Sequence, residues 1–205
     1  VSFSYDSNTK VIDKLSCVFT KGINCIVGQS GCGKSTLLKL LMGIYEPDSG
    51  SIAGFDIAER QVPISDRIAY VPSEDFLLND TLAKNVAMGK EPDDTGILYA
   101  LQRANIAEVA DATPEGLNYT ITEGGKNLSL GQQQRIAIAR AIYVDQPVII
   151  FDEPTANLDV DAIEQYWKTL VALSDEDHIC IIVTHDKKLI DRCENVLYLN
   201  SGTGE

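Results

Sequence analysis

The sequence lacks long hydrophobic runs and is poor in positive charge. No apolar segment approaches the roughly 20 residues that a transmembrane helix needs. The first ten residues, VSFSYDSNTK, are polar and alternating, unlike a signal peptide. The 17 Lys and Arg residues are outnumbered by 30 Asp and Glu, which gives a net charge of −13. Nucleic acid is therefore not an expected partner, because a general nucleic-acid-binding protein carries a basic face.

Cysteines are few and show no paired spacing. The chain has 5 of them, an odd number, and none forms a C-x-x-C motif. This pattern argues against a disulfide framework and against a zinc site. It is typical of reduced thiols in a cytosolic protein.

Internal repeats and low-complexity linkers are also missing, so we expect a single domain over residues 1–205. The runs VIIF (148–151) and CIIV (180–183) are continuous and rich in β-branched residues, as in parallel strands that are covered on both faces. Apolar residues with helical spacing lie between them. These residues are Val160, Ile163, Trp167, Leu170 and Val171. Strand, helix and strand in this order predict a βαβ unit.

The middle of the chain has a different pattern. From about Asp80 to Asn127 the sequence is polar and helical, and Asp80 is the expected N-cap of its first helix. We therefore expect an α/β core formed by about 1–75 and 141–205. A helical subdomain over about 76–140 would be inserted into it.

The segment GQSGCGKST (28–36) follows a short apolar strand and precedes a helical pattern. It fits the motif G-x-x-x-x-G-K-[ST], in which glycines let backbone N–H groups approach a phosphate and the next helix adds its positive end. The lysine reaches the outer phosphates, and the serine hydroxyl suits Mg²⁺. The alternative is a flexible surface loop. We predict that the phosphates of a nucleotide are bound by Gly28, Ser30, Gly31, Cys32, Gly33, Lys34, Ser35 and Thr36.

Cys32 has a second expected property. It lies near Lys34 and the start of a helix, and both favour the thiolate form of a cysteine. The sequence therefore predicts a reactive thiol that bound ATP protects.

Two acidic residues follow the strand 148–151. Acids at the carboxyl end of a buried parallel strand project into the ligand crevice. Asp152 is the expected metal partner together with Ser35, and Glu153 is placed to polarise the attacking water. The alternative is that the two acids merely cap a strand at the surface.

The segment LSLGQQQR (128–135), taken with the phosphate loop and FDEPTANLD (151–159), resembles the ATP-binding cassette (ABC) family, specifically the nucleotide-binding domain of ABC transporters. The family signature is L-S-G-G-Q, and Leu130 stands where the family has its first glycine. The resemblance implies an α/β fold, namely a P-loop NTPase core with a mostly parallel sheet, an N-terminal antiparallel β part and an inserted helical subdomain.

The resemblance also implies roles for residues outside the phosphate loop. The signature residues Ser129, Leu130, Gly131 and Gln132 would act in trans, on the nucleotide of a second ABC domain. Tyr5 matches the aromatic residue that stacks on adenine. Asp159 matches the acid of a loop at the dimer interface, and His185 matches the histidine that contacts the γ-phosphate. By itself, LSLGQ would be an ordinary helix start capped by Ser129.

Segments 114–132 and 77–89 resemble the exporter branch of the family, with importer ATPase subunits as the nearer rival. The family's first strand normally starts before VSFSY, and family members usually continue beyond SGTGE with a helix. We therefore expect a domain of a longer chain, with a transmembrane permease fused before Val1. It would lie at the cytoplasmic face of a membrane and pair with an identical or different ABC domain.

One further departure bears on turnover. The family has a glutamine after V-P that reaches the metal, and Ser73 takes its place here. Because serine is shorter, its direct metal contact is doubtful. The alternatives are that Glu74 or a water takes its place, or that the site couples weakly. Two hypotheses follow, an ATP hydrolase that powers an export permease and a degenerate cassette that binds ATP and dimerises but hydrolyses it poorly.

Overall fold

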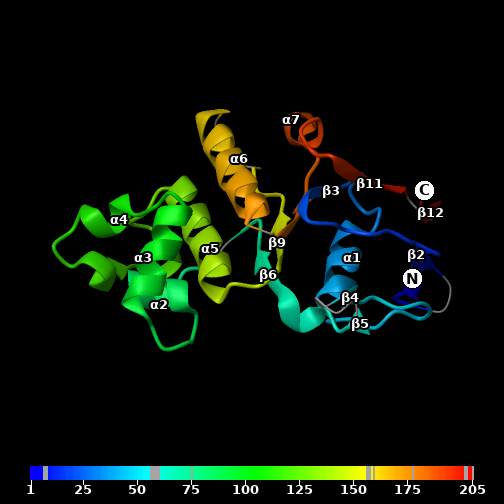
Figure 1. Cartoon of the computed structure of the whole chain (residues 1–205), viewed down its shortest axis with the longest axis horizontal. Helices are drawn as coiled ribbons and strands as arrows, with labels where there is room; N and C mark the ends of the chain where they lie inside the picture. The colour runs from blue at the N-terminus through cyan, green and yellow to red at the C-terminus, as the bar shows by residue number, and fades with distance from the viewer. Residues whose placement is uncertain are drawn as a thin grey trace.

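Five parallel strands run through the centre of the molecule (Figure 1). The structure is a computed structural model, and it describes residues 1–6, 9–55, 61–74, 76–155, 158, 160–176, 178–200 and 203–204. The sheet has the order β12-β11-β3-β10-β9-β6, in which only β12 is antiparallel to its neighbour. Its strands are β12 (Thr203–Gly204), β11 (Asn195–Asn200), β3 (Gly22–Gly28), β10 (Ile179–Val183), β9 (Val148–Asp152) and β6 (Ile68–Val71).

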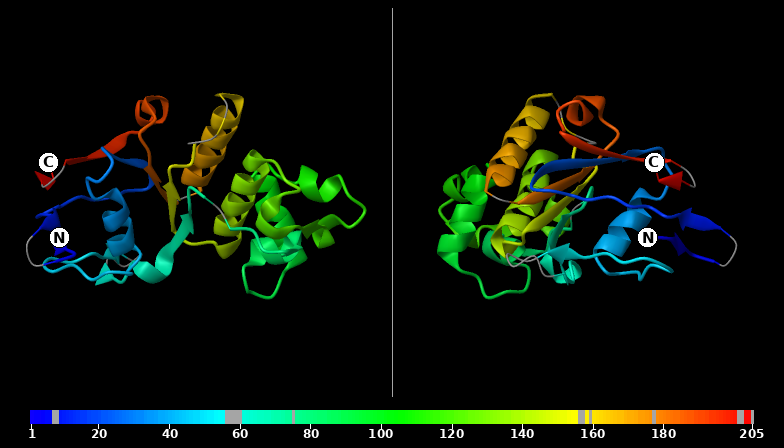
Figure 2. Two further views of the ribbon diagram at one scale, coloured as in Figure 1. Left: turned by 180° about the vertical axis from the view of Figure 1, so that it is seen from behind. Right: turned by 45° about the vertical axis from the view of Figure 1, so that its right-hand side comes forward.

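The two faces of the sheet are covered by different helices. Side chains alternate along a strand, so Ile149 and Phe151 point to one face of β9, and Val148 and Ile150 point to the other. Helix α1 (Lys34–Leu41) packs on the second face. Helices α5 (Leu130–Val144) and α6 (Val160–Asp175) pack on the first (Figure 2). The predicted βαβ unit is thus confirmed as β9, α6 and β10.

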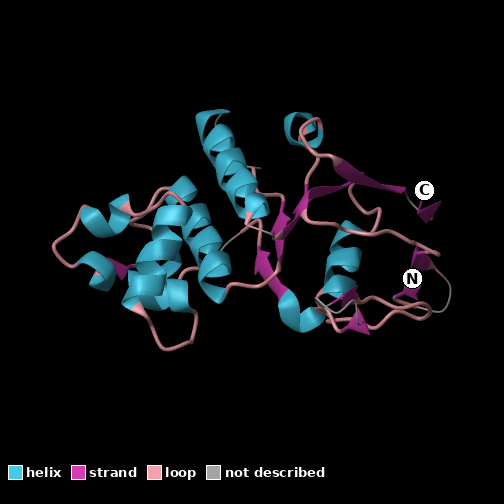
Figure 3. Ribbon diagram, viewed as in Figure 1, coloured by secondary structure: helices cyan, strands magenta, loops and turns pink. Residues whose placement is uncertain are grey.

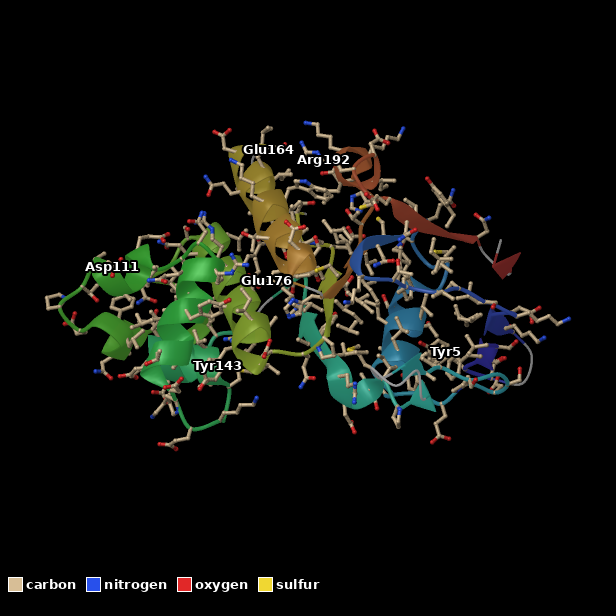
Figure 4. All side chains as sticks on the ribbon, viewed as in Figure 1. Tyr5, Asp111, Tyr143, Glu164, Glu176 and Arg192 are labelled. Atoms are coloured by element: carbon tan, nitrogen blue, oxygen red, sulfur yellow. The ribbon has the colours of Figure 1, made fainter. Side chains whose placement is uncertain are left out.

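The buried face of α6 differs from the predicted stripe. Its buried residues are Tyr166, Leu170 and Leu173, whereas Val160 is 62% exposed. Val160 is the first residue of the helix, which has not yet reached the sheet there. The outer side of α6 is held by Arg192, which forms an ion pair with Glu164 (Figure 4).

A group of helices that includes α5 lies beyond β6 (Figure 3). Its members are β7 (Asp80–Thr81), α2 (Leu82–Ala87), α3 (Asp94–Arg103), α4 (Glu108–Asp111), η2 (Gly116–Asn118), β8 (Thr120–Ile121), η3 (Glu123–Gly125) and α5. Thr81, not Asp80, caps α2, because the Thr81 side chain accepts a hydrogen bond from the Lys84 N–H. Asp80 instead accepts from the Thr81 N–H and from Lys84 Nζ.

Short antiparallel pairs lie at the opposite end of the molecule (Figure 1). They are β1 (Phe3–Ser4) with β2 (Lys10–Ile12), and β4 (Gly54–Phe55) with β5 (Gln61–Val62). The turn η1 (Ser65–Arg67) and helix α7 (Lys187–Ile190) complete the fold. The predicted fold class is confirmed. Within the described ranges, no helix is both long and apolar enough to cross a bilayer.

A buried polar network joins α2 to α5. The Asn85 side chain is fully buried and accepts from the Leu78 N–H at 2.8 Å. Its amide group donates to the carbonyls of Leu78, Asp80 and Thr81. From α5, the guanidinium of Arg140 donates to the Asn85 carbonyl at 2.6 Å and to the Asn85 side-chain oxygen at 3.2 Å. This network fixes the segment that leads from β6 into the helical group.

Replacing Asn85 should therefore destabilise the protein markedly. Asn85→Ala leaves three partly buried carbonyls and one guanidinium donor without this partner, and a fully buried group of this kind costs about 1–3 kcal/mol. We expect a loss of about 2–4 kcal/mol in the free energy of unfolding, measured by urea denaturation. Asn79→Ala, at an exposed position of the same segment, is the control. Equal stability of the two variants would contradict this role.

Candidate nucleotide-binding site

The loop 28–36 joins β3 to α1, and its shape depends on glycine. Gly33 has a φ angle of 106°, which L side chains rarely adopt, and it is the N-cap of α1. A Cβ on Gly28 would come within 2.7 Å of the Leu199 carbonyl oxygen on β11. The loop therefore turns tightly over the edge of the sheet and brings the first N–H groups of α1 to its open end. Free N–H groups at a helix start, with the helix dipole behind them, form an anion site.

The side chain of Lys34 closes over this loop. Its ammonium group donates to the carbonyl of Gly28 at 2.7 Å and to that of Gln29 at 3.1 Å. The positive charge is thus held at the loop by the backbone itself. It lies where the sequence predicts a phosphate contact.

Glu153 and His185 meet at the carboxyl edge of the sheet. Glu153 follows β9 directly and has a φ angle of 46°, an uncommon conformation for a residue other than glycine. Its N–H donates to the Val183 carbonyl on β10 at 2.8 Å, which helps to hold this conformation. His185 Nδ1 lies 2.9 Å from Glu153 Oε2. Strained backbone of this kind is concentrated at functional sites.

Asp152 has a partner that the sequence analysis missed. The Tyr70 hydroxyl, from β6, donates to Asp152 Oδ2 at 2.8 Å. Burial, with a further contribution from Asp152, raises the pKa of Tyr70 above its ordinary value. Because that ordinary value already lies well above neutral pH, the hydroxyl is protonated and can donate. The sequence signal that could have pointed to Tyr70 was that the strands 68–71 and 148–152, if parallel neighbours, end at the same edge of the sheet.

Comparison with known proteins decides the family. The sequence profile described as ABC transporter matches residues 14–156. The chain belongs to the ABC transporter family. It is 35% identical over 209 aligned positions to an ATP-dependent lipid A-core flippase of Burkholderia thailandensis, covering 98% of this chain and 35% of the flippase.

Other relatives point to the same branch. The Lactococcin-G-processing and transport ATP-binding protein LagD of Lactococcus lactis is 35% identical, over 98% of this chain and 29% of that protein. A solved structure of a bacterial Atm1-family ABC exporter with ATP bound matches with a TM-score of 0.85 and 30% identity, over 100% of this chain and 36% of that one. The chain spans about a third of the length of these proteins. The predicted resemblance to exporter-type ABC domains is confirmed, and membership of the family implies ATP binding.

In this ABC domain Tyr5 lies beside helix α1 (Figure 4). Its hydroxyl is 3.0 Å from Thr36 Oγ1, and its ring meets those of Phe3 and Tyr45 edge to face. The side chain is 57% exposed, so one part of the ring faces solvent. The stacking of Tyr5 on adenine stays a prediction.

The signature segment begins α5, on the face of the sheet opposite to α1, and the two helices are well separated in Figure 1. Ser129 caps α5 by accepting from the Gln132 N–H at 3.2 Å, and the Gln132 side chain accepts from the Ser129 N–H at 2.9 Å. Leu130 is 49% exposed. Asp159, the predicted acid of the dimer-interface loop, lies outside the described residues.

The oxygen groups at the sheet edge suit Mg²⁺. This ion prefers hard oxygen ligands and takes only one or two from the protein when it accompanies a nucleotide. The Ser35 hydroxyl is exposed at the first turn of α1, and Asp152 is half-buried at the end of β9. Ser73, the doubtful metal contact, is half-buried. The side chain that donates a hydrogen bond to Asp152 is Tyr70.

The burial of Cys32 argues against the predicted reactivity of its thiol. The residue is only 3% exposed and belongs to the apolar cluster that contains Ile12, Leu37 and Leu199. Its backbone N–H remains part of the loop and donates to the Gln29 carbonyl at 3.2 Å. Inside the tight turn the side chain points into the core, which the residue pattern alone does not reveal.

We therefore expect Cys32 to resist thiol reagents in the folded chain, with or without ATP. The native protein would be treated with N-ethylmaleimide and the modified cysteines identified by mass spectrometry. Cys17, which is exposed, serves as the internal control, and Cys32 should react only after denaturation. Labelling of native Cys32 that ATP blocks would restore the original prediction.

Proposed function

We propose that this domain binds and hydrolyses MgATP and thereby powers an export permease. The contact of His185 with Glu153 at the carboxyl edge of the sheet carries this proposal. A domain that only bound nucleotide would need the loop 28–36 but not a carboxylate held beside a histidine. Ligands of open α/β sheets bind outside the carboxyl ends of the strands, where both features lie.

Each group has a definite task in this proposal. The N–H groups of the loop and the Lys34 ammonium bind the phosphates. Ser35 and Asp152 would hold the Mg²⁺ that accompanies ATP, which would supply positive charge beside the phosphates. The Glu153 carboxylate accepts a proton from the attacking water, and His185 orients that carboxylate and contacts the γ-phosphate.

A second ABC domain would complete the site. Ser129 and the first N–H groups of α5 lie on the outside of the helical group, where they can face the nucleotide of a partner. Because Leu130 is exposed, its side chain can also lie at the contact between the two domains without disturbing the core. Asp159 would serve the same interface.

The relatives supply the class of partner. The flippase and the Lactococcin-G transporter are named for different cargoes, and this domain matches about a third of each. We propose that a fused permease recognises the cargo and that this domain supplies the energy. The division into a core of about 1–75 and 141–205 and a helical subdomain of about 76–140 belongs to the same proposal.

The second candidate is a degenerate cassette that binds ATP and pairs but hydrolyses slowly. Ser73 and Leu130 favour it, because both depart from the family pattern at positions that face the nucleotide. An importer subunit is the weaker alternative, since the relatives described above are a flippase, a bacteriocin transporter and an exporter.

The variant Glu153→Gln separates ATP binding from ATP hydrolysis. The amide can hold a water but cannot accept its proton, and loss of a general base costs about 10²–10⁴-fold in rate. We expect unchanged ATP affinity in calorimetry, no measurable phosphate release and a dimer on gel filtration with MgATP. Lys34→Ala is the matched control, and it should lose ATP binding and remain monomeric.

Two results would count against the proposal. Phosphate release that persists in Glu153→Gln would remove Glu153 from the chemistry. Slow release by the unaltered chain, with ATP binding and dimerisation intact, would favour the degenerate cassette.

A further inference from the structure

We propose that Tyr70 is a positioning residue for the metal site, because its hydroxyl holds one oxygen of the Asp152 carboxylate and leaves the other oxygen to face the metal of bound MgATP. The inference rests on the proposed function, in which Asp152 is a metal partner. It adds a residue from a strand that carries none of the predicted site residues.

The sheet register brings Tyr70 to this position. Strands β6 and β9 are adjacent and parallel, with Tyr70 opposite Ile150. Residues two apart on a strand share a face, so Tyr70, Ile150 and Asp152 all lie on the face that α1 covers. A step of two residues along a parallel strand is about 6.6 Å, which a tyrosine side chain can span. The resulting distance from Tyr70 Oη to Asp152 Oδ2 is 2.8 Å.

The chemistry of the pair suits a metal ligand. A carboxylate has two oxygens that can accept several hydrogen bonds, and the Tyr70 hydroxyl occupies one site on Oδ2. A neutral donor orients the carboxylate without cancelling its negative charge, whereas a Lys or Arg would compete with the metal. Partners of this kind fix the direction of ligating side chains and are worth about 10–100-fold in metal affinity or activity.

Tyr70 also connects the site to the helical group. It lies near the end of β6, and the chain then runs through Ser73 to Asn85 and the buried network with Arg140. Ser73 has a shorter reach toward the metal than the glutamine of the family pattern. The Tyr70–Asp152 hydrogen bond instead ties the metal carboxylate to the strand from which this segment starts.

Tyr70→Phe tests the inference, because it removes the hydroxyl and keeps the ring. Calorimetry of ATP binding in EDTA and in Mg²⁺ gives the gain in affinity that the metal provides. We expect unchanged affinity in EDTA and a metal-dependent gain that is about tenfold smaller than in the unaltered chain. Tyr99→Phe, at a 52% exposed tyrosine of α3, is the matched control and should behave like the unaltered chain.

A double variant tests whether Tyr70 acts through Asp152. Asp152→Asn should lose most of the metal-dependent gain, and adding Tyr70→Phe to it should cause no further loss. An additive loss in the double variant would overturn the inference. A full metal-dependent gain in ATP affinity in Tyr70→Phe would also overturn it. The same holds if Tyr70→Phe loses ATP affinity equally in EDTA and in Mg²⁺. Thermal unfolding without nucleotide, expected to be unchanged in Tyr70→Phe, separates positioning from a purely structural role.

The failure of the proposed function would look different. If the unaltered chain binds ATP equally well in EDTA and in Mg²⁺, Asp152 has no role as a metal ligand. The proposed role of Tyr70 is then refuted as well. If the unaltered chain shows the gain and Tyr70→Phe retains it, only the inference about Tyr70 is overturned.

Discussion

The parallel pairing of β3, β10, β9 and β6 is the constraint on which the candidate site depends. Parallel strands all end at one edge, so segments far apart in the chain are delivered to the same place. The loop after β3, the acids after β9 and the histidine after β10 converge for this reason. The pairing of Val183 with Asp152 places the carbonyl that holds Glu153 opposite the end of β9. A slip of one residue would turn these side chains to the other face.

The helical group is tied to the sheet in two ways. One is apolar, where α5 lies beside α6 and buries residues on the face of the sheet. The other is polar, where Asn85 and Arg140 hold the chain that leaves β6. The polar network fixes the path of that segment more specifically than apolar contacts would. Hydrogen bonds depend on the direction of donor and acceptor, whereas apolar attraction does not.

The sequence predicted the central strands and the phosphate loop because their signals are local. Continuous β-branched runs mark buried strands, and glycine spacing marks the loop. It failed where the answer depended on contacts between distant residues. The α6 stripe was shifted because the position of the helix over the sheet decides which side is buried. Asp80 and Thr81 are both good caps, and only the geometry of β7 selects the second. Two further features arise from tertiary packing, and no local sequence pattern predicts them. They are the burial of the Cys32 side chain and the contact of Tyr70 with Asp152.

The capping box at the start of α5 has a consequence for which residue can stand at position 129. As a helix cap, the Ser129 oxygen only accepts a hydrogen bond, and an aspartate would do that equally well. In the proposed dimer, a phosphate brought by the partner domain would need the opposite, a proton to donate and no negative charge. A hydroxyl can accept and donate at the same time, so one serine oxygen could serve both the helix and the anion. Helix stability alone leaves position 129 open to several residues, and the proposed phosphate contact would narrow the choice to a hydroxyl.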